Sequence, residues 1–388
     1  MPAVWTYPWG LYAEGIDDSL AELASRGIDA IAPATHYHSV RSMQPRTPDQ
    51  LFDRYAGGCY FDPDPDRFRD TPIEPIPNRI ASAVDPLGEI TAVADDHGLA
   101  VRGWTVLAHN SRLGATYPEY RTRDAFDNPH EHAFCPSHDE VQAYYAGIVA
   151  NLADYDLGEI ELESVGYQSV FHGHDTKFGH PKRQVLTSST EEWLLSQCFC
   201  DACHDRAESV DLVRAQASIQ KLVRESFENP HTDPPALSAL LREYPVLRDL
   251  FDFRANAIAE LFARLADAAT DVDLDYYLMD GFGTNPGDGW PAGVRLTDVE
   301  RYCDRATALC YVTDPSVARD RIRTLKRCVD VPVDVGVTLA PGVIESESQF
   351  LALMEVVRAE ATGEVTIYHH SLTTEAQLDW IERAVSGT

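Results

Sequence analysis

Gly158-Glu-Ile-Glu-Leu-Glu-Ser164 alternates acidic and aliphatic side chains with the period of two that is typical of a β-strand. Ile160 and Leu162 fall on one face, where helices can cover them, and Glu161 and Glu163 share the other face. The alternative is a solvated edge strand with outward glutamates. An all-parallel sheet has no face in water, so we favour a barrel strand whose glutamates point into the barrel.

The same kind of β-rich run recurs along the whole chain, separated by helical runs. The predicted strands are 4–9, 28–35, 100–108, 159–164, 274–279, 306–312, 331–339 and 365–369. Helical runs at 19–25, 87–97, 140–152, 316–326, 347–361 and 375–385 separate them. Eight strands, each followed by a helix or by room for one, predict an α/β fold of the (β/α)8 TIM-barrel type. We expect one domain over residues 1–388, with long insertions after strands two and four at about 37–85 and 165–271.

Two nucleotide-binding folds are disfavoured by the absence of their motifs. No G-x-G-x-x-G and no G-x-x-x-x-G-K-[ST] follows any early strand. The backbone turns that hold a pyrophosphate or a triphosphate depend on those glycines. The sequence therefore argues against a dinucleotide-binding or P-loop fold.

The composition describes a very acidic chain with a large core. It has 388 residues, 44% of them hydrophobic, and a net charge of −30. Only four of its 32 basic residues are lysines, and the acidic residues are spread through the whole chain. Such a surface stays hydrated in high salt, where screening removes its self-repulsion, so a halophilic source is our hypothesis. The sequence has no basic stripe, which disfavours binding to nucleic acid or to an anionic membrane.

The chain shows no targeting signal. The segment from Met1 has no basic region, and no run approaches the roughly 18 apolar residues of a membrane span. We therefore expect neither a signal peptide nor a transmembrane helix, and a cytoplasmic location. Cysteines in that compartment are metal ligands or reduced core residues rather than disulfides. A homo-oligomer is compatible with the sequence, which carries no local signature of an interface.

Glu163 and Glu161 are the leading catalytic candidates. Residues at the carboxyl ends of barrel strands form the site in TIM-barrel enzymes, and Glu163 ends its strand. The two glutamates are about 6–7 Å apart along the strand. Burial should raise the pKa of at least one of them, which suits a general acid.

Polar and aromatic residues at other strand ends could bind substrate. The substrate-binding candidates are His36 and His38 after strand two, Trp104, His109 and Asn110 at strand three, and His369 and His370 after strand eight. Asp280, after strand five, could supply a second carboxylate. The Phe171-His-Gly-His-Asp175 stretch could contact substrate or metal, although a plain surface loop explains it equally well. Aromatic side chains such as Trp5, Tyr7 and Trp9 could stack on a sugar ring, or they could belong to the core.

Cysteine spacing predicts a metal site. Cys198, Cys200 and Cys203 form a C-x-C-x-x-C run, which places three thiolates close together and suits tetrahedral Zn²⁺. His204 is adjacent but would have to fold back sharply to reach the same ion. Cys135 lies in a separate loop and is the better fourth ligand. The competing interpretation is a set of buried free cysteines.

The order of these features resembles the family 42 β-galactosidases. The resemblance lies in His132-Ala-Phe-Cys-Pro-Ser137 before a helix, then a strand ending in glutamate, then Cys198-Phe-Cys-Asp-Ala-Cys203 leading into a helix. In that family the cysteine of Y-C-P-x-S and the triplet jointly bind structural zinc, and the intervening strand ends in the acid/base glutamate. The resemblance, which covers about 129–207, implies Cys135, Cys198, Cys200 and Cys203 as zinc ligands. It implies Glu163 as the acid/base, with Glu161 as the fallback.

The chain departs from the family at two positions that bear on activity. The family has Asn-Glu at the end of strand four, whereas this chain has Leu162-Glu163. The family places a nucleophilic glutamate at the end of strand seven, where this chain reads Thr338-Leu-Ala-Pro341. Asp334 comes too early to reach the mouth, and Glu345 comes after it. We therefore expect the barrel and the zinc to carry over, and β-galactosidase activity not to.

The sequence predicts a glycoside hydrolase that acts on a small carbohydrate or glycoside. Glu163 is the predicted general acid, and Asp280 or Glu161 is the base or nucleophile. The zinc is expected to be structural, because four protein ligands leave no open position for water. One alternative is a sugar isomerase or lyase with a hard metal at the mouth, held by His36, His38 and the two glutamates. The other is a non-catalytic carbohydrate-binding barrel.

Overall fold

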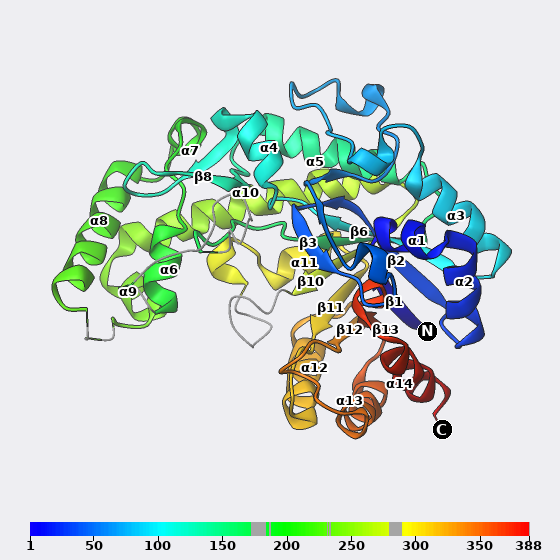
Figure 1. Cartoon of the computed structure of the whole chain (residues 1–388). Helices are drawn as coiled ribbons and strands as arrows, with labels where there is room; N and C mark the ends of the chain where they lie inside the picture. Colours follow the sequence, from blue (N-terminus) through cyan, green and yellow to red (C-terminus); the bar gives the residue numbers. More distant parts are fainter. Residues whose placement is uncertain (172–183, 186–187, 231, 233, 279–288, 388) are drawn as a thin grey trace.

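The computed structural model describes residues 1–171, 184–185, 188–230, 232, 234–278 and 289–387. Its main sheet has nine strands in the order β1-β13-β12-β11-β10-β9-β6-β2-β5, and β1 also pairs with β2. Eight of these strands run parallel and close into a barrel, whereas β5 adds on antiparallel to β2. The predicted TIM barrel is confirmed (Figure 1).

The element bounds agree with the predicted ones to within a few residues. The barrel strands are β1 Pro2–Thr6, β2 Ala30–Tyr37, β6 Ala100–Val106, β9 Glu159–Glu163, β10 Asp273–Leu278, β11 Arg305–Leu309, β12 Val333–Thr338 and β13 Val365–Tyr368. The helices are α1 Pro8–Glu14, α2 Ile16–Ser25, α3 Pro86–Asp96, α4 Ser111–Thr116, α5 Asp139–Leu152, α6 Ser189–Leu195, α7 Asp201–Arg206, α8 Leu212–Glu228, α9 Leu237–Glu243, α10 Pro245–Ala269, α11 Leu296–Tyr302, α12 Pro315–Cys328, α13 Glu347–Glu360 and α14 Glu375–Ser386.

Strand β9 shows why the alternating pattern folds as it does. Ile160 and Leu162 are fully buried in the main hydrophobic core under the helices. Glu161 faces the barrel axis, where it meets side chains from β1 and β10. A closed barrel buries both faces of a strand. In β9 the outer face is apolar, and on the inner face Glu161 finds hydrogen-bond partners across the axis.

The connections that carry extra structure lie on the mouth side of the barrel. The segment 38–85 forms a hairpin, β3 Val40–Met43 with β4 Phe52–Tyr55, and the short strand β5 Gly58–Cys59. After β9 come α6 to α9 and then the long helix α10, which packs against α5. A third elaboration was not predicted. The connection after β6 contains α4 and a second hairpin, β7 Arg121–Arg123 with β8 Pro129–Phe134.

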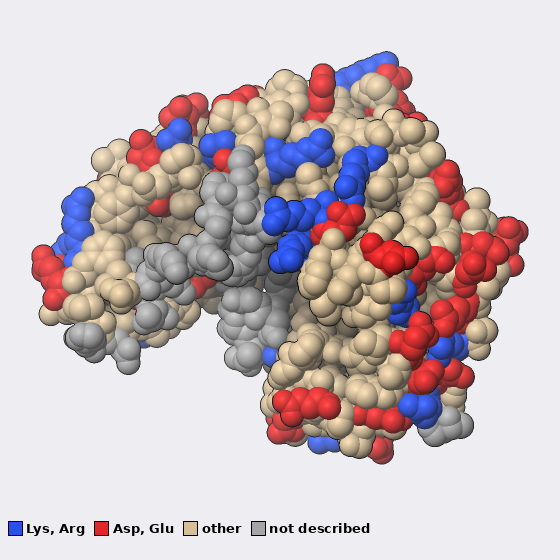
Figure 2. Space-filling model, viewed as in Figure 1, with Lys and Arg blue, Asp and Glu red and all other residues tan. Residues whose placement is uncertain are grey.

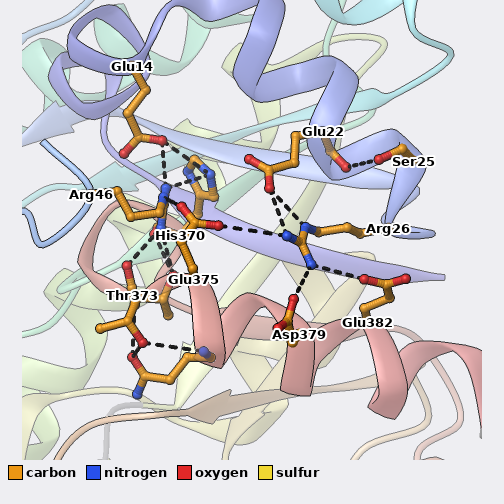
Figure 3. A network of polar contacts seen from close by, with 12 residues as sticks. Glu14, Glu22, Ser25, Arg26, Arg46, His370, Thr373, Glu375, Asp379 and Glu382 are labelled. Carbon is orange, nitrogen blue, oxygen red and sulfur yellow. Dashed lines mark hydrogen bonds and ion pairs between the residues drawn. The ribbon is translucent and has the colours of Figure 1, made fainter.

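Ion pairs join the first and last βα units where the barrel closes. Arg26, just after α2, contacts Asp379 and Glu382 on α14, each at 2.9 Å, as well as Glu22 on α2 (Figure 3). One guanidinium therefore links the two ends of the chain through several carboxylates.

In the part of the chain that the structure describes, no helix is both long enough and apolar enough to cross a bilayer.

A glycine on β12 makes room for an indole inside the barrel. A Cβ at Gly336 would lie 2.6 Å from the Trp5 ring and 2.6 Å from Leu309. Such a contact is far inside van der Waals distance, so a larger residue would displace the indole. Gly336 therefore sets the position from which Trp5 reaches β9.

Candidate functional site

Glu163 lies at the carboxyl end of β9, where the barrel opens. Its carboxylate accepts a hydrogen bond of 2.6 Å from Nε1 of Trp104 on β6. Burial raises the pKa of Glu163 to about 7, although the Trp104 hydrogen bond opposes this shift. The side chain is partly exposed, so a ligand can reach it. A carboxyl group that is half protonated near neutral pH can donate a proton and later take it back.

Glu161 lies one layer deeper and is closed off from solvent. Only 1% of it is exposed. The carboxylate accepts hydrogen bonds from Trp5 Nε1, at 2.8 Å, and from the hydroxyl of Tyr277. Burial raises the pKa of Glu161 to about 7, opposed by Arg102, whose Nη1 lies 3.7 Å away. These contacts fix the side chain beneath Glu163.

Aromatic side chains line the barrel above and beside the two glutamates. Tyr7 Oη lies 3.4 Å from Tyr37 Oη and 3.2 Å from Tyr368 Oη. The Tyr7 ring also stacks on Trp9, with centroids 4.1 Å apart, and Trp104 lies edge-on to Tyr368. Flat apolar faces edged by hydroxyl groups can stack on the apolar face of a sugar ring and hydrogen-bond its hydroxyls. The sequence named Trp104 but missed Tyr37 and Tyr368.

His369 is held in this aromatic group and has hydrogen-bonding capacity to spare. It is 2% exposed, and its ring centroid lies 3.9 Å from that of Tyr7 and 5.8 Å from that of Trp104. Neither ring nitrogen has a hydrogen-bond partner among the described residues. Burial lowers the pKa of His369 well below its usual value, so the ring is neutral. A neutral imidazole offers one donor and one acceptor to a ligand.

His370 has a different role, because its partners are all protein groups. Its Nε2 lies 2.9 Å from Nη2 of Arg46, and its Nδ1 lies 3.2 Å from Oγ1 of Thr6 (Figure 3). A guanidinium can only donate, so Nε2 is the acceptor and Nδ1 carries the proton. Arg46 also binds Glu14 at 2.7 Å and the carbonyls of His370 and Thr373. His370 therefore anchors the end of β13 beside His369.

The strand-two histidines separate in the structure. His36 is fully buried between the barrel and α5, where Nδ1 donates to the carbonyl of Val106 and Nε2 lies 3.2 Å from the hydroxyl of Tyr144. Burial lowers the pKa of His36 to about 4, so it is neutral. His38 is at the mouth, with its ring 4.8 Å from that of His109 on the neighbouring connection.

Asn110 acts on the backbone. Its Oδ1 accepts hydrogen bonds of 3.1 Å from the amides of Arg112 and Leu113, which caps the start of α4. Its Nδ2 donates to the carbonyl of Tyr37 at 3.2 Å. Asn110 thus joins the ends of β6 and β2 and holds their mouth residues in register.

The sequence predicted Asp280 or Glu161 as the second carboxylate beside Glu163. Asp280 lies outside the described residues. On β12, Asp334 is near the start of the strand and makes a double hydrogen bond with Arg305, each of 2.7 Å. Thr338 ends β12, in agreement with the absence of a carboxylate there in the sequence. Glu159 and Glu161 share the inner face of β9 with Glu163, and Glu161 is the nearer of the two along the strand.

A second group of carboxylates fills the opposite end of the barrel. Oxygen atoms of Glu159, Asp275 and Asp334 lie within 4.8 Å of one another, a spacing that a cation could bridge. Two guanidinium groups already occupy this place: Arg305 Nε lies 3.4 Å from Glu159, and Arg102 Nη1 lies 3.2 Å from it. We therefore assign this group to an ion-pair network that closes the barrel floor.

The four predicted zinc ligands come together. Sulfur atoms of Cys135, Cys198, Cys200 and Cys203 all lie within 4.8 Å of one another, and all four residues are buried. The Sγ atom of Cys203 is 3.5 Å from that of Cys135 and 3.6 Å from that of Cys200. Tetrahedral Zn²⁺ with bonds of about 2.3 Å requires sulfur separations of about 3.8 Å. The set thus fits a zinc ion, while His204 is exposed on α7.

A buried arginine beside the sulfurs was missed in the sequence. Nη1 of Arg254, on α10, donates to Sγ of Cys203 at 3.0 Å, and the residue has no exposed surface. Its guanidinium carbon lies 4.9 Å from the Tyr167 ring centroid. The signal was present, because Arg254 interrupts the apolar stripe of α10 that includes Phe251 and Ile258. An arginine in a core stripe requires an anionic partner.

The similarity of this chain to known proteins was found in its fold and not in its sequence. No family model and no curated protein matches it. The catalytic domain of a β-amylase from Paenibacillus polymyxa superimposes with a TM-score of 0.53 and 13% identity, covering 100% of this chain and 98% of that one. A β-galactosidase from the psychrophilic Marinomonas ef1 gives 0.56 and 13%, covering 99% of this chain and 59% of that one. An α-L-fucosidase isoenzyme from Paenibacillus thiaminolyticus gives 0.53 and 14%, covering 96% and 46%.

The structural neighbours are glycoside hydrolases with TIM-barrel catalytic domains. This chain spans about half the length of the β-galactosidase and the fucosidase. The superpositions establish the shared barrel, and identities of 13% and 14% leave the activity to be argued from the site. The likeness to family 42 in the zinc region stays an expectation from the sequence.

Proposed function

We propose that the protein hydrolyses a glycosidic bond in a small carbohydrate or glycoside, with Glu163 as the general acid. The observation that carries the proposal is the place of Glu163 at the carboxyl end of β9, with a pKa of about 7 and a hydrogen bond from Trp104. The aromatic lining and the glycoside hydrolases among the structural neighbours point to the same substrate class.

The second carboxylate in this proposal is Asp280 or Glu161. Glu161 is on the same inner face of β9, but Trp5 and Tyr277 already occupy its carboxylate. Asp280 follows β10, the neighbouring strand, in the sequence. His369, His38 and His109 would orient the sugar from the adjoining strand ends. A metal-dependent isomerase gains no support, because His36 faces α5 rather than the mouth.

The test is the dependence of Glu163→Gln on the leaving group. Dinitrophenolate departs without a proton, whereas an alkoxide needs one, so loss of a general acid affects the two substrates differently. We expect kcat/KM to fall about 10²- to 10⁴-fold for alkyl glycosides and much less for dinitrophenyl glycosides. Glu355→Gln, which changes an exposed carboxylate on α13, is the matched control.

Two outcomes would contradict the proposal. Equal losses on both leaving groups would show that Glu163 does not protonate the departing oxygen. No turnover of any glycoside by the parent protein, in low or high salt, would leave a carbohydrate-binding barrel without hydrolase activity.

We also propose that the cysteine cluster binds one structural zinc ion. Cys135, Cys198, Cys200 and Cys203 would hold it, and it would supply cross-links between the β8 connection and α7 rather than chemistry. Arg254 supports the proposal, because a buried guanidinium beside four neutral thiols would have no counter-charge. Four thiolates around Zn²⁺ carry a net negative charge that Arg254 offsets.

A further inference from the structure

The β3–β4 hairpin places two arginines face to face. Arg41 and Arg54 are direct cross-strand partners in this antiparallel pair. Like charges in this arrangement destabilise a sheet, because their side chains are held a few ångströms apart. A chain with a net charge of −30 has ample carboxylates with which to separate them. The pairing therefore has a local cost that the fold itself does not require.

Neither guanidinium is neutralised by a carboxylate. In the described part of the chain, Arg41 and Arg54 form no ion pair. By contrast, the single guanidinium of Arg26 contacts several acidic side chains. Arg41 instead lies over the ring of Phe52, with 4.7 Å between its guanidinium carbon and the ring centroid. Among the described residues, the guanidinium of Arg112, at the start of α4, donates to the carbonyls of Gly57 and Pro77.

The same face of the hairpin exposes large apolar side chains. Met43 and Phe52 are the next cross-strand pair on this face, and they are 49% and 55% exposed. The opposite face of the hairpin packs inward. Ser42 on that face accepts a hydrogen bond of 3.2 Å from Trp9. Arg41, Met43, Phe52 and Arg54 thus form one outward face, which we call the hairpin face.

The hairpin face flanks the barrel mouth. β3 follows β2 after a two-residue connection at the carboxyl end of that strand, and Val40 packs against the aromatic group that contains Tyr7 and Trp104. Figure 2 shows basic side chains gathered around the hairpin, while acidic side chains dominate the right and lower parts of the same view. Anions are therefore repelled from most of this surface and attracted next to the mouth.

We propose that the hairpin face binds an anionic carbohydrate, one that carries carboxylate or sulfate groups, and guides it to the mouth. The Phe52 ring would stack on the apolar face of a sugar ring, and the forks of Arg41 and Arg54 match the geometry of a carboxylate or sulfate. The bound anion relieves the repulsion between the two arginines. This inference rests on the proposed function, because it assumes that the barrel acts on carbohydrates.

The experiment uses pairs of carbohydrate probes that share a backbone and differ in charge. Oligogalacturonate and its methyl ester share one backbone, and dextran sulfate and dextran form a second such pair. Titration calorimetry at low ionic strength should show binding of a polyanion and much weaker binding of its neutral partner. The double variant R41Q/R54Q should lose about tenfold or more in affinity for the polyanion and nothing for the neutral partner.

The control and the stacking variant separate charge from shape. Arg323→Gln removes an exposed arginine on α12 that pairs with Glu360, and it should leave the affinity unchanged. Phe52→Ala should weaken binding while it leaves the charge intact. The carboxylate and sulfate probes distinguish the two kinds of acidic sugar.

Several results would overturn the proposal. These are binding of neither polyanion by the parent, equal binding of charged and neutral probes, and equal affinities of the parent and R41Q/R54Q. A change of R41Q/R54Q from oligomer to monomer in light scattering would assign the hairpin face to contact with a second copy. The test is independent of hydrolysis, because Glu163→Gln should lower kcat/KM for neutral alkyl glycosides by about 10²- to 10⁴-fold and leave polyanion binding intact.

Discussion

Trp104 on β6 donates its indole hydrogen bond to the carboxylate of Glu163 on β9, over 2.6 Å. The two residues lie on neighbouring barrel strands, so the pairing of β6 with β9 brings their side chains together. The bond stabilises the ionised carboxylate, and burial acts in the opposite direction and prevails. The balance leaves the pKa of Glu163 at about 7, within the range in which a general acid works.

Replacement of Trp104 by Phe should move the basic limb of the pH–activity profile upward. A general acid must be protonated, so activity falls as the pH rises through the pKa of Glu163. Loss of the indole donor removes a bond to the charged form, and the pKa should rise by about one unit. The measurement is kcat/KM against pH. Trp9→Phe, which loses a hydrogen bond to Ser42 instead, is the control, and an unmoved limb would contradict the prediction.

Glu161→Gln should make stability less sensitive to pH. Burial raises the pKa of Glu161 from its ordinary value of 4.5 to about 7 in the folded protein. Between these values the folded state keeps a proton that the unfolded state has released, so the stability of the parent falls as the pH rises. The full effect is about 3 kcal/mol. Chemical denaturation of both proteins at acidic and neutral pH should show a loss about 3 kcal/mol smaller in the variant than in the parent. A loss due to Glu163, whose pKa is also raised, should remain in both proteins.

Cys200→Ser should release the zinc and destabilise the fold. Three remaining thiolates and a hydroxyl bind Zn²⁺ more weakly, and the connections that the ion joins would then separate. Elemental analysis should find about one zinc per parent chain and far less in the variant, with a lower unfolding temperature. Cys328→Ser, at an exposed cysteine outside the cluster, is the control. A full zinc content in Cys200→Ser would refute the site.

Arg254→Met should accelerate the loss of zinc. The substitution keeps a long side chain in the pocket but removes the cation 3.0 Å from Cys203 Sγ. The ion and its four thiolates then lack their buried counter-charge, so we expect release to a chelator to be about tenfold faster or more. Arg254→Lys should restore part of the difference. Identical release rates for parent and Met variants would show that Arg254 only fills space.

His369→Phe should weaken substrate binding without harming the fold. Phenylalanine keeps the ring contact with Tyr7 but removes the donor and the acceptor that have no partner among the described residues. One lost hydrogen bond corresponds to about a tenfold increase in KM. The unfolding temperature should be unchanged, since no protein hydrogen bond is lost. An unaltered KM would place His369 outside the substrate site.

Local pattern was enough for the strands and for the cysteines. The period of two in Glu159–Glu163 indicates an apolar face and a polar face of β9 without any knowledge of the neighbouring strands, because a strand alternates its side chains by geometry alone. Cysteine spacing marked Cys198, Cys200 and Cys203 as one group for the same reason. Cys135, 63 residues earlier than Cys198 in the numbering, required the added argument of a separate loop.

Residues whose role depends on partners across the barrel were beyond that reach. The sequence left Trp5 open between sugar stacking and the core and did not single out Tyr277, and only closure of the barrel brings both to Glu161. His36 and His38, two positions apart, looked equivalent, yet the first faces α5 and the second faces the mouth.

The sequence by itself determined the barrel, the inward glutamates and the cysteine set, because each follows from the spacing of residues along the chain. Only the tertiary structure decided that Glu163 is open to a ligand, that the His369 ring has no hydrogen-bond partner among the described residues, and that the guanidinium groups of Arg41 and Arg54 have no carboxylate partner among them. Those properties depend on burial and on distances between strands remote in sequence. Burial and these distances determine pKa values and ion pairs, and neither can be predicted from the order of neighbouring residues in the sequence.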